Sequence, residues 1–71
     1  MIASERERLL RLVAELSDAD PDLRFGQMVT NLATMARGAI DGAIWDAEDD
    51  ELSTAAQRLL NHYRQREAVV A

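Results

Sequence analysis

Apolar residues recur every three or four positions in three stretches of this chain, and no stretch alternates apolar and polar residues. The first pattern is typical of amphipathic helices, whereas a half-buried strand would show strict alternation. We therefore predict an all-α fold, a compact three-helix unit with helices over roughly residues 4–17, 21–37 and 47–67. A chain of 71 residues makes one domain at most, so residues 1–71 are assigned to a single helical domain. The short first connection favours antiparallel packing of the first two helices.

Residues that favour helix ends stand at several of these boundaries. Ser4 and Glu7 fit a capping box, in which each side chain accepts a hydrogen bond from the backbone amide of the other residue. Asp20 is predicted to cap the second helix, with Pro21 as its first residue. Ser53 also lies near a predicted helix end, so we expect it to be a cap or a surface residue.

The apolar faces of the helices predict which side chains form the core. Gly26 lies on a face of small residues in the second helix, and glycine inside a helix costs about 1 kcal/mol relative to alanine. A close approach of another helix would offset that cost, so we expect a tight crossing at Gly26. The predicted core residues are Leu9, Leu10, Leu12, Val13 and Leu16, then Phe25, Met28, Val29, Leu32, Met35 and Ala36, then Leu52, Ala55, Ala56, Leu59, Leu60 and Tyr63.

The shortness of the chain limits the stability that it can reach alone. A small chain buries a smaller fraction of its surface than a large one, and small domains often depend on disulfides, metals or self-association. The chain has no Cys and a single His, His62, which excludes disulfides, Cys-ligated metals and His-pair sites. Self-association in a homodimer is the remaining way to complete the core.

The only Trp of the chain, Trp45, is followed by five carboxylates within six residues. Acids favour the N-terminal end of a helix, where unpaired amides and the positive end of the helix dipole lie. We therefore interpret the block first as the start of the third helix. The alternatives are a docking surface for a partner and, with the least weight, a metal or catalytic site. The five acids are Asp46, Glu48, Asp49, Asp50 and Glu51.

Trp45 and Tyr63 are the side chains best suited to an interface, because Trp and Tyr are favoured hot spots of binding. A single Trp in a short chain is nevertheless usually buried. We expect Ile44 and Trp45 to return the chain to the core after the glycine-containing loop of residues 38–43. A subunit interface is the alternative place for Trp45 and Tyr63, because a small chain can complete its core with its own copy.

One side of the predicted second helix is polar and lies opposite its apolar face. Arg24, Gln27, Asn31 and Thr34 share this side, and Gln27 and Asn31 are four residues apart and can pair. We favour an internal role over ligand binding, because buried backbone groups need hydrogen-bond partners. In that role Asn31 would hold the backbone of the following loop.

The residues give no support for catalysis or for a bound cofactor. No glycine-rich phosphate loop and no zinc-protease, kinase or hydrolase motif occurs in the sequence. Asp18, Asp20 and Asp22 are spaced like the start of a calcium loop, but Leu23 and Val29 stand where such a loop needs Gly and a bidentate Glu. We therefore predict no enzymatic activity, no metal, no cofactor and no small-molecule substrate.

The charge balance argues against nucleic acid as a partner. The chain has 13 acidic and 8 basic residues and a net charge of −5, whereas nucleic-acid binding usually begins with a basic surface. No segment has the length of a membrane span, and no apolar signal-peptide run follows the charged Glu5. We expect a cytoplasmic protein without a nucleic-acid or membrane partner.

Two motifs in this order resemble those of a group of small uncharacterised bacterial proteins. They are residues 21–31, P-D-L-R-F-G-Q-M-V-T-N, and residues 44–52, I-W-D-A-E-D-D-E-L. The pattern of the group is approximately P-D-L/W-R-L/F-G-Q-L/I-I/V-x-N, a short spacer, an aromatic residue and I/V-E-D-D/E-E-L/F. The match covers about half of the chain and departs at residues 46–47, where the group has an aromatic and an aliphatic residue.

The resemblance implies a common fold and no particular activity. It also implies that the polar side of the second helix and the acidic block belong to one constellation, in which either Arg24 or the polar side of the second helix meets the acids that begin the third helix. An Arg–carboxylate fork has a specific geometry. The remaining members of the constellation would be Gly26, Gln27 and Asn31.

The sequence thus predicts a small non-enzymatic helical protein that acts through protein–protein contacts. Its partner would be a second copy, in a homodimer, or another protein. The alternative is an antitoxin- or immunity-type or other regulatory factor whose acidic patch covers a basic partner surface. Charge complementarity would speed such an association, and salt would weaken it.

Overall fold

Four helices make up the chain, three of them long and one short. The computed structural model describes the backbone of residues 2–70 and the side chains of residues 4–66. Its elements are α1 (Ile2–Ala19), α2 (Phe25–Arg37), α3 (Ala43–Asp46) and α4 (Asp49–Val70), and no strand occurs among residues 2–70. The all-α prediction is confirmed. The three predicted helices are present, and α3 lies in a stretch that the sequence left without a helix.

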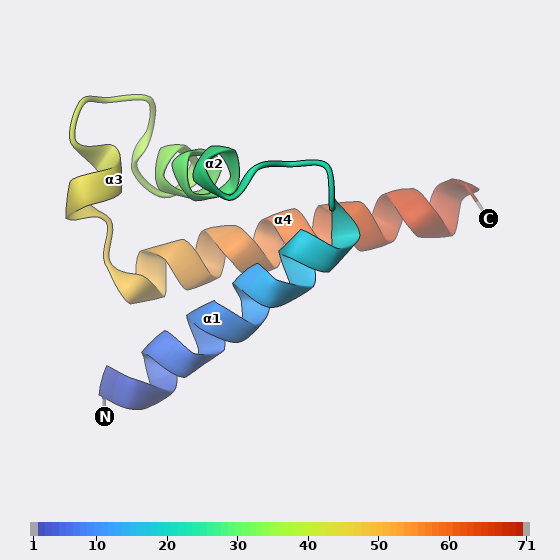
Figure 1. Cartoon of the computed structure of the whole chain (residues 1–71), viewed down its shortest axis with the longest axis horizontal. Coiled ribbons are helices and arrows are strands. Elements are labelled where there is room, and N and C mark those ends of the chain that lie inside the picture. The colour runs from blue at the N-terminus through green and yellow to red at the C-terminus, as the bar shows by residue number, and fades with distance from the viewer. Residues whose placement is uncertain (1, 71) are drawn as a thin grey trace.

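The long helices are arranged around α4 (Figure 1). α1 and α4 lie side by side and run in the same direction, whereas α2 crosses this pair and is seen nearly end-on. Three side-chain contacts join α1 and the residue after it to α4, one near the start of both helices and two farther along both, as expected for parallel helices. They are Arg6 with Asp49 at 2.8 Å, Glu15 with Arg64 at 2.9 Å, and Asp20 with Tyr63 at 3.1 Å. The predicted antiparallel packing of the first two helices is wrong, because the turn after α1 sends α2 across the pair.

The core lies where α1, α2 and α4 meet. Ala55 and Ala56 of α4 are 3% and 0% exposed, and their small side chains allow the other two helices to approach closely. The predicted apolar faces of α1 and α4 are largely confirmed, apart from Leu10, which is 60% exposed. The buried cluster consists of Leu12, Leu16, Met28, Leu32, Ala55, Ala56 and Leu60, with Val13, Leu23, Ala36, Leu52, Leu59 and Tyr63 packed against it.

The ends of α1 and α2 differ from the prediction. α1 begins at Ile2, so Ser4 lies inside its first turn and the predicted capping box is wrong. α2 begins at Phe25 and not at Pro21, because residues 21–23 form a turn in which the amide of Leu23 donates to the carbonyl of Asp20 at 3.2 Å. This turn places the half-buried Leu23 against the core.

α2 touches the rest of the molecule through a narrower strip than predicted. Met28 and Leu32 are buried, but Phe25 near one end is 63% exposed and Met35 near the other is 38% exposed. A helix that crosses its neighbours contacts them only near the crossing, so residues toward its ends face solvent. Gly26 is exposed, and a Cβ built there meets no atom within 4 Å, so the predicted tight crossing at Gly26 is wrong.

Ser53 is the polar residue buried most deeply in the described part of the chain. It lies in the second turn of α4, it is 0% exposed, and its Oγ has no hydrogen-bond partner there. The expectation that Ser53 is a cap or a surface residue is wrong, because α4 begins four residues earlier, at Asp49. An unsatisfied buried hydroxyl lowers stability by the cost of its desolvation.

We therefore expect Ser53→Ala to raise the free energy of unfolding by about 1–2 kcal/mol, because it removes the unpaired hydroxyl. Urea or thermal denaturation followed by circular dichroism measures the change. Ser17→Ala on α1 is the matched control, and its gain should not exceed the difference in helix propensity, about 0.5 kcal/mol. A Ser53→Ala protein less stable than the wild type would show that the hydroxyl has a partner.

Candidate functional site

The residues singled out in the sequence lie in three separate places. Arg24, Gly26, Gln27 and Asn31 are at the cap and in the first half of α2. The stretch from Trp45 to Glu51 forms the junction of α3 and α4, and Tyr63 lies farther along α4, beside the end of α1. The structure therefore does not bring them together as one constellation.

Arg24 does not meet the acidic block. It is the exposed N-cap of α2, and its side chain forms no ion pair with any described residue. The acids lie instead near the opposite end of α2, where Arg37 is the last helical residue, and Arg37 binds Glu51 at 3.0 Å. The predicted contact between Arg24 and the acids is therefore wrong, and Arg37, which lies outside the first motif, forms the Arg–carboxylate contact of α2 with the acidic block.

The predicted pair of Gln27 and Asn31 is also absent. The Oε1 of Gln27 accepts a hydrogen bond from the backbone amide of Arg24 at 3.0 Å and so caps α2. Asn31 is exposed, and among the described residues its side chain makes no hydrogen bond, so the expectation that it holds the next loop is wrong. That loop is held by its own backbone hydrogen bonds.

The acidic block begins α4, which confirms the first interpretation of it. The carboxylate of Glu51 accepts a hydrogen bond from the amide of Glu48 at 2.8 Å, and the carboxylate of Asp50 accepts one from the amide of Glu51 at 2.9 Å. Asp49 and Glu51 also bind Arg6 of α1 and Arg37 of α2. These two acids therefore join the start of α4 to both of the other long helices.

Hydrogen bonding lowers the pKa of Glu51 below its ordinary value of 4.5. The largest cause is the backbone amide of Glu48, and the nearby Arg37 acts in the same direction, whereas desolvation opposes both. A carboxylate that is stabilised in the folded state loses its contribution when it is protonated. Glu51 thus makes the junction of α2 and α4 sensitive to acid.

Three large apolar side chains project from the connection between α2 and α4. Ile40 is 63% exposed, Ile44 is 55% exposed and Trp45 is 89% exposed. We call these three residues the apolar knob. The expectation that Ile44 and Trp45 return to the core is wrong, because α3 turns Ala43, which is 7% exposed, toward the interior and its next two residues outward.

The backbone beneath the knob is held by a series of hydrogen bonds. The amide of Ile40 donates to the carbonyl of Gly38 at 2.9 Å, and the amide of Ala43 donates to the carbonyl of Ile40 at 3.2 Å. Gly38 and Gly42 have φ angles of 89° and 82°, a conformation that favours glycine over residues with a Cβ. α3 also contacts α2. The knob is therefore presented on a defined backbone.

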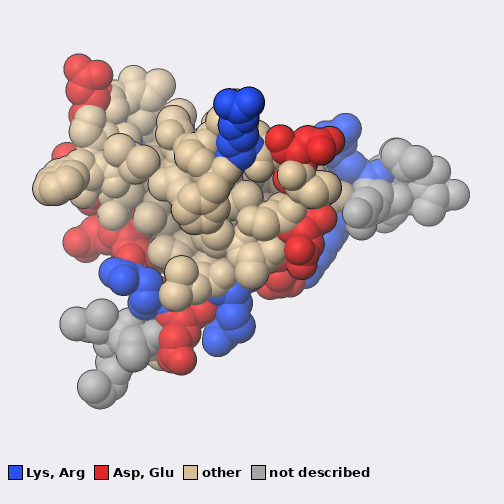
Figure 2. Space-filling view, in the orientation of Figure 1, with Lys and Arg blue, Asp and Glu red and all other residues tan. Residues whose placement is uncertain are grey.

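Acidic side chains surround the knob. Asp41, Asp46 and Glu48 are exposed and form no ion pair with any described residue, and we call these three the acidic rim. On the face shown in Figure 2, acidic side chains gather at the end of the molecule where α3 lies in Figure 1. Within the acidic block, Asp49 and Glu51 thus tie helices together, whereas Asp46 and Glu48 face solvent on either side of the end of α3.

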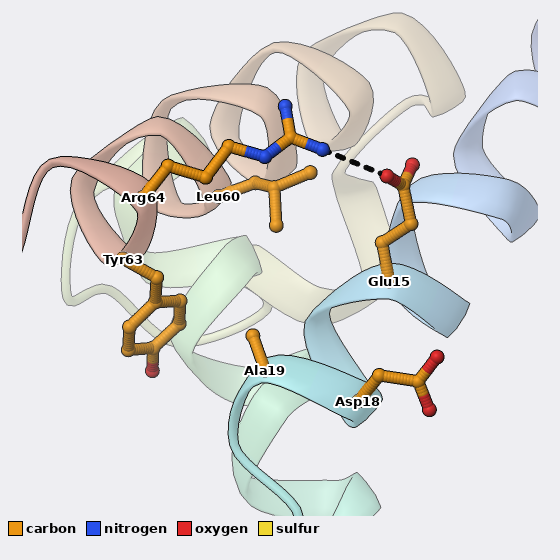
Figure 3. Close-up of a pocket in the computed structure, with 6 residues that line it drawn as sticks. All are labelled: Glu15, Asp18, Ala19, Leu60, Tyr63 and Arg64. Carbon is orange, nitrogen blue, oxygen red and sulfur yellow. Dashed lines mark hydrogen bonds and ion pairs between the residues drawn. The ribbon is translucent and has the colours of Figure 1, made fainter. Parts of the chain in front are cut away.

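Tyr63 belongs to a different place, the joint between α1 and α4. Its half-buried hydroxyl donates to Oδ2 of Asp20 at 3.1 Å, and burial, followed by this hydrogen bond, raises its pKa above 10.0. A shallow hollow of about 280 Å³ lies beside it, and Figure 3 shows Arg64 reaching across to Glu15. Because these polar side chains bind one another, we assign the hollow to the joint of the helices.

The sequence analysis missed Ile40 of the knob and Arg6 and Arg37, which pair with the acids. Ile40 stands between two glycines, and a large apolar residue in such a loop was the available signal for an exposed contact. Nothing in the sequence distinguished Arg37 from Arg24, because the choice depends on the direction in which α2 crosses.

Comparison of the chain with protein-family models, with curated proteins and with solved structures finds no match. The resemblance to the small bacterial proteins stays a prediction. Among the described residues no cluster of three or more His, Cys, Asp or Glu side chains could hold a metal ion. None of the described helices combines the length and the apolar character needed to cross a membrane.

The lowered pKa of Glu51 predicts a specific acid dependence of stability. The contribution of Glu51 is present above its ordinary pKa of 4.5 and is lost as the pH falls through the lowered value in the folded state. Glu51→Gln should therefore reduce the difference in unfolding free energy measured between about pH 6 and about pH 3. Glu48→Gln is the control, because it removes a carboxylate that forms no ion pair with a described residue. An unchanged pH dependence in Glu51→Gln would contradict the role of this carboxylate.

Proposed function

We propose that this chain is a non-enzymatic protein that acts by protein–protein contact, and that the apolar knob is its contact surface. The observation that carries the proposal is Trp45, which is 89% exposed beside two further exposed large apolar side chains. Large apolar side chains that gather at the surface of a small protein are characteristic of interaction sites. Trp is also among the residues that most often dominate binding energy.

The fixed backbone beneath the knob supports the same proposal. Ordering a loop during association costs free energy, so a contact on an already ordered loop binds more tightly for the same area. The hydrogen bonds around Gly38, Ile40 and Ala43 provide this order before any partner arrives. Exposure of Trp45 thus has a structural cause, which is the orientation of α3.

The exposed area of the chain supports a protein partner. The chain exposes 5221 Å², whereas a monomeric protein of 7.9 kDa exposes about 4,400 Å² by the usual scaling with mass. The excess is about 800 Å², close to the area that each partner buries in a standard interface. Such an interface would suit a second copy or another protein, and because small domains often depend on self-association, a homodimer is our first proposal for the assembly.

The unpaired acids of the rim favour a second candidate function. Asp41, Asp46 and Glu48 have no basic neighbour within ion-pair distance in the described part of the chain, so a basic surface of another protein would complement them. An antitoxin- or immunity-type factor would use the rim in this way. A chain that stays monomeric at high micromolar concentration, and whose gene neighbours that of a basic toxin or nuclease, would favour this candidate over the homodimer.

Replacement of Trp45 tests the proposal directly. Trp45→Ala should abolish self-association, measured by size-exclusion chromatography with light scattering, because it removes the largest and most exposed apolar side chain of the knob. The same substitution should change the unfolding free energy of the dilute protein by no more than about 0.5 kcal/mol, because the side chain is exposed. Leu10→Ala, at another exposed apolar residue, is the matched control and should associate like the wild type. A Trp45→Ala protein that unfolds would contradict the assignment of Trp45 to the surface.

A further inference from the structure

A knob that binds a second copy needs a complementary surface on that copy. Two knobs placed against each other by a twofold axis would bring the acidic rims of both copies together. Like charges facing each other across an interface cost free energy. The complementary surface is therefore expected elsewhere on the chain, and it should combine apolar side chains with unpaired basic ones.

One hollow on the far part of α4 has this composition. It measures about 440 Å³ and lies between α2 and α4. We call it the α2–α4 hollow. Its lining contains apolar side chains, one Arg, one His and no acid, and consists of Met35, Arg58, Leu59, Asn61, His62 and Gln65.

We infer that the apolar knob of one copy docks into the α2–α4 hollow of a second copy. This inference rests on the proposed function, in which the knob is the contact surface. The contact thus joins two different surfaces, the knob of one copy and the hollow of the other. If a twofold axis relates the copies, each knob docks into the hollow of the other copy and two such contacts form at once.

Charge complementarity is the first argument for this pairing. Arg58 is exposed and forms no ion pair with a described residue, and the exposed His62 follows one turn later. Docking of the knob would bring the acidic rim of one copy close to these basic side chains of the other. Arg58 would thus gain an ion-pair partner in the rim of the other copy, in addition to Asp50 and Glu51 of its own chain, which line the adjoining hollow with it but form no ion pair with it.

The chemistry of the hollow suits an indole ring. Met35 is 38% exposed, and the thioether of Met contacts aromatic rings favourably. A guanidinium such as that of Arg58 is attracted to the face of Trp more than to that of the other aromatic rings. Leu59 supplies further apolar surface. Trp45, Met35 and Arg58 are therefore the expected centre of the interface.

The knob cannot fill the hollow of its own chain. α3 precedes the start of α4 at Asp49, whereas the α4 residues that line the hollow run from Arg58 to Gln65, nine to sixteen residues farther along that helix. A helix rises about 1.5 Å per residue, which separates them from Asp49 by roughly 14–24 Å. The contacts that α3 makes with α2 also hold the knob at its own end of the molecule. A second copy is thus required.

Sedimentation velocity over a range of concentrations tests the pairing with variants of each surface. Arg58→Glu should weaken self-association by at least about tenfold, because it places an acid where the acidic rim docks. Arg11→Glu, which makes the same charge change at an exposed position on α1, should associate like the wild type. Met35→Gln should weaken association without any change of charge, and circular dichroism of each variant verifies that it is folded.

A mixture of Trp45→Ala and Arg58→Glu proteins provides the decisive comparison. In a twofold dimer of either variant both contacts are damaged, whereas a mixed dimer has one intact contact, formed by the knob of the Arg58→Glu protein and the hollow of the Trp45→Ala protein, so the mixture should associate more tightly than the Trp45→Ala protein alone. If Arg58→Glu and Met35→Gln associate like the wild type while Trp45→Ala does not, the hollow is the wrong receptor and the knob remains the contact surface. A wild type that is monomeric at high micromolar concentration would overturn both this inference and the homodimer.

Discussion

The fold depends on one strip of α4, where Ala55 and Ala56 leave room for two other helices. α1 lies along this strip and α2 crosses it, so the core is formed at a crossing and not along three aligned helices. Because α2 crosses, its last residue, Arg37, reaches the start of α4 and binds Glu51 there. The connection between α2 and α4 is then left outside the core, and the short α3 forms within it with Trp45 in solvent.

The helices themselves followed from local features of the sequence. The spacing of Leu12 and Leu16 on α1, and of Ala56 and Leu60 on α4, predicted the buried faces, because helical periodicity is a property of short segments. The acids before Leu52 predicted the start of α4 because capping and the helix dipole act within one turn. The fold class could therefore be predicted before any tertiary contact was known.

The errors share a different origin, the direction in which α2 crosses. Phe25 and Gly26 were assigned to the interior because they lie on faces that would be buried if α2 ran along its neighbours. Arg24 was paired with the acids because it belongs to the more recognisable motif, whereas the structure places Arg37 beside them. Exposure of Trp45 could not be predicted for a further reason, since apolar character alone does not distinguish a core residue from one that faces solvent.

The central claim is that Trp45 faces water in the isolated chain and becomes covered in a complex. The fluorescence of this residue measures that directly, because it is the only Trp of the chain. In a dilution series we predict emission typical of a water-exposed indole at the lowest concentrations and a progressive shift to shorter wavelengths as the concentration rises. Emission that is already at short wavelength in the most dilute sample, and that does not change with concentration, would place Trp45 in the core and contradict the account.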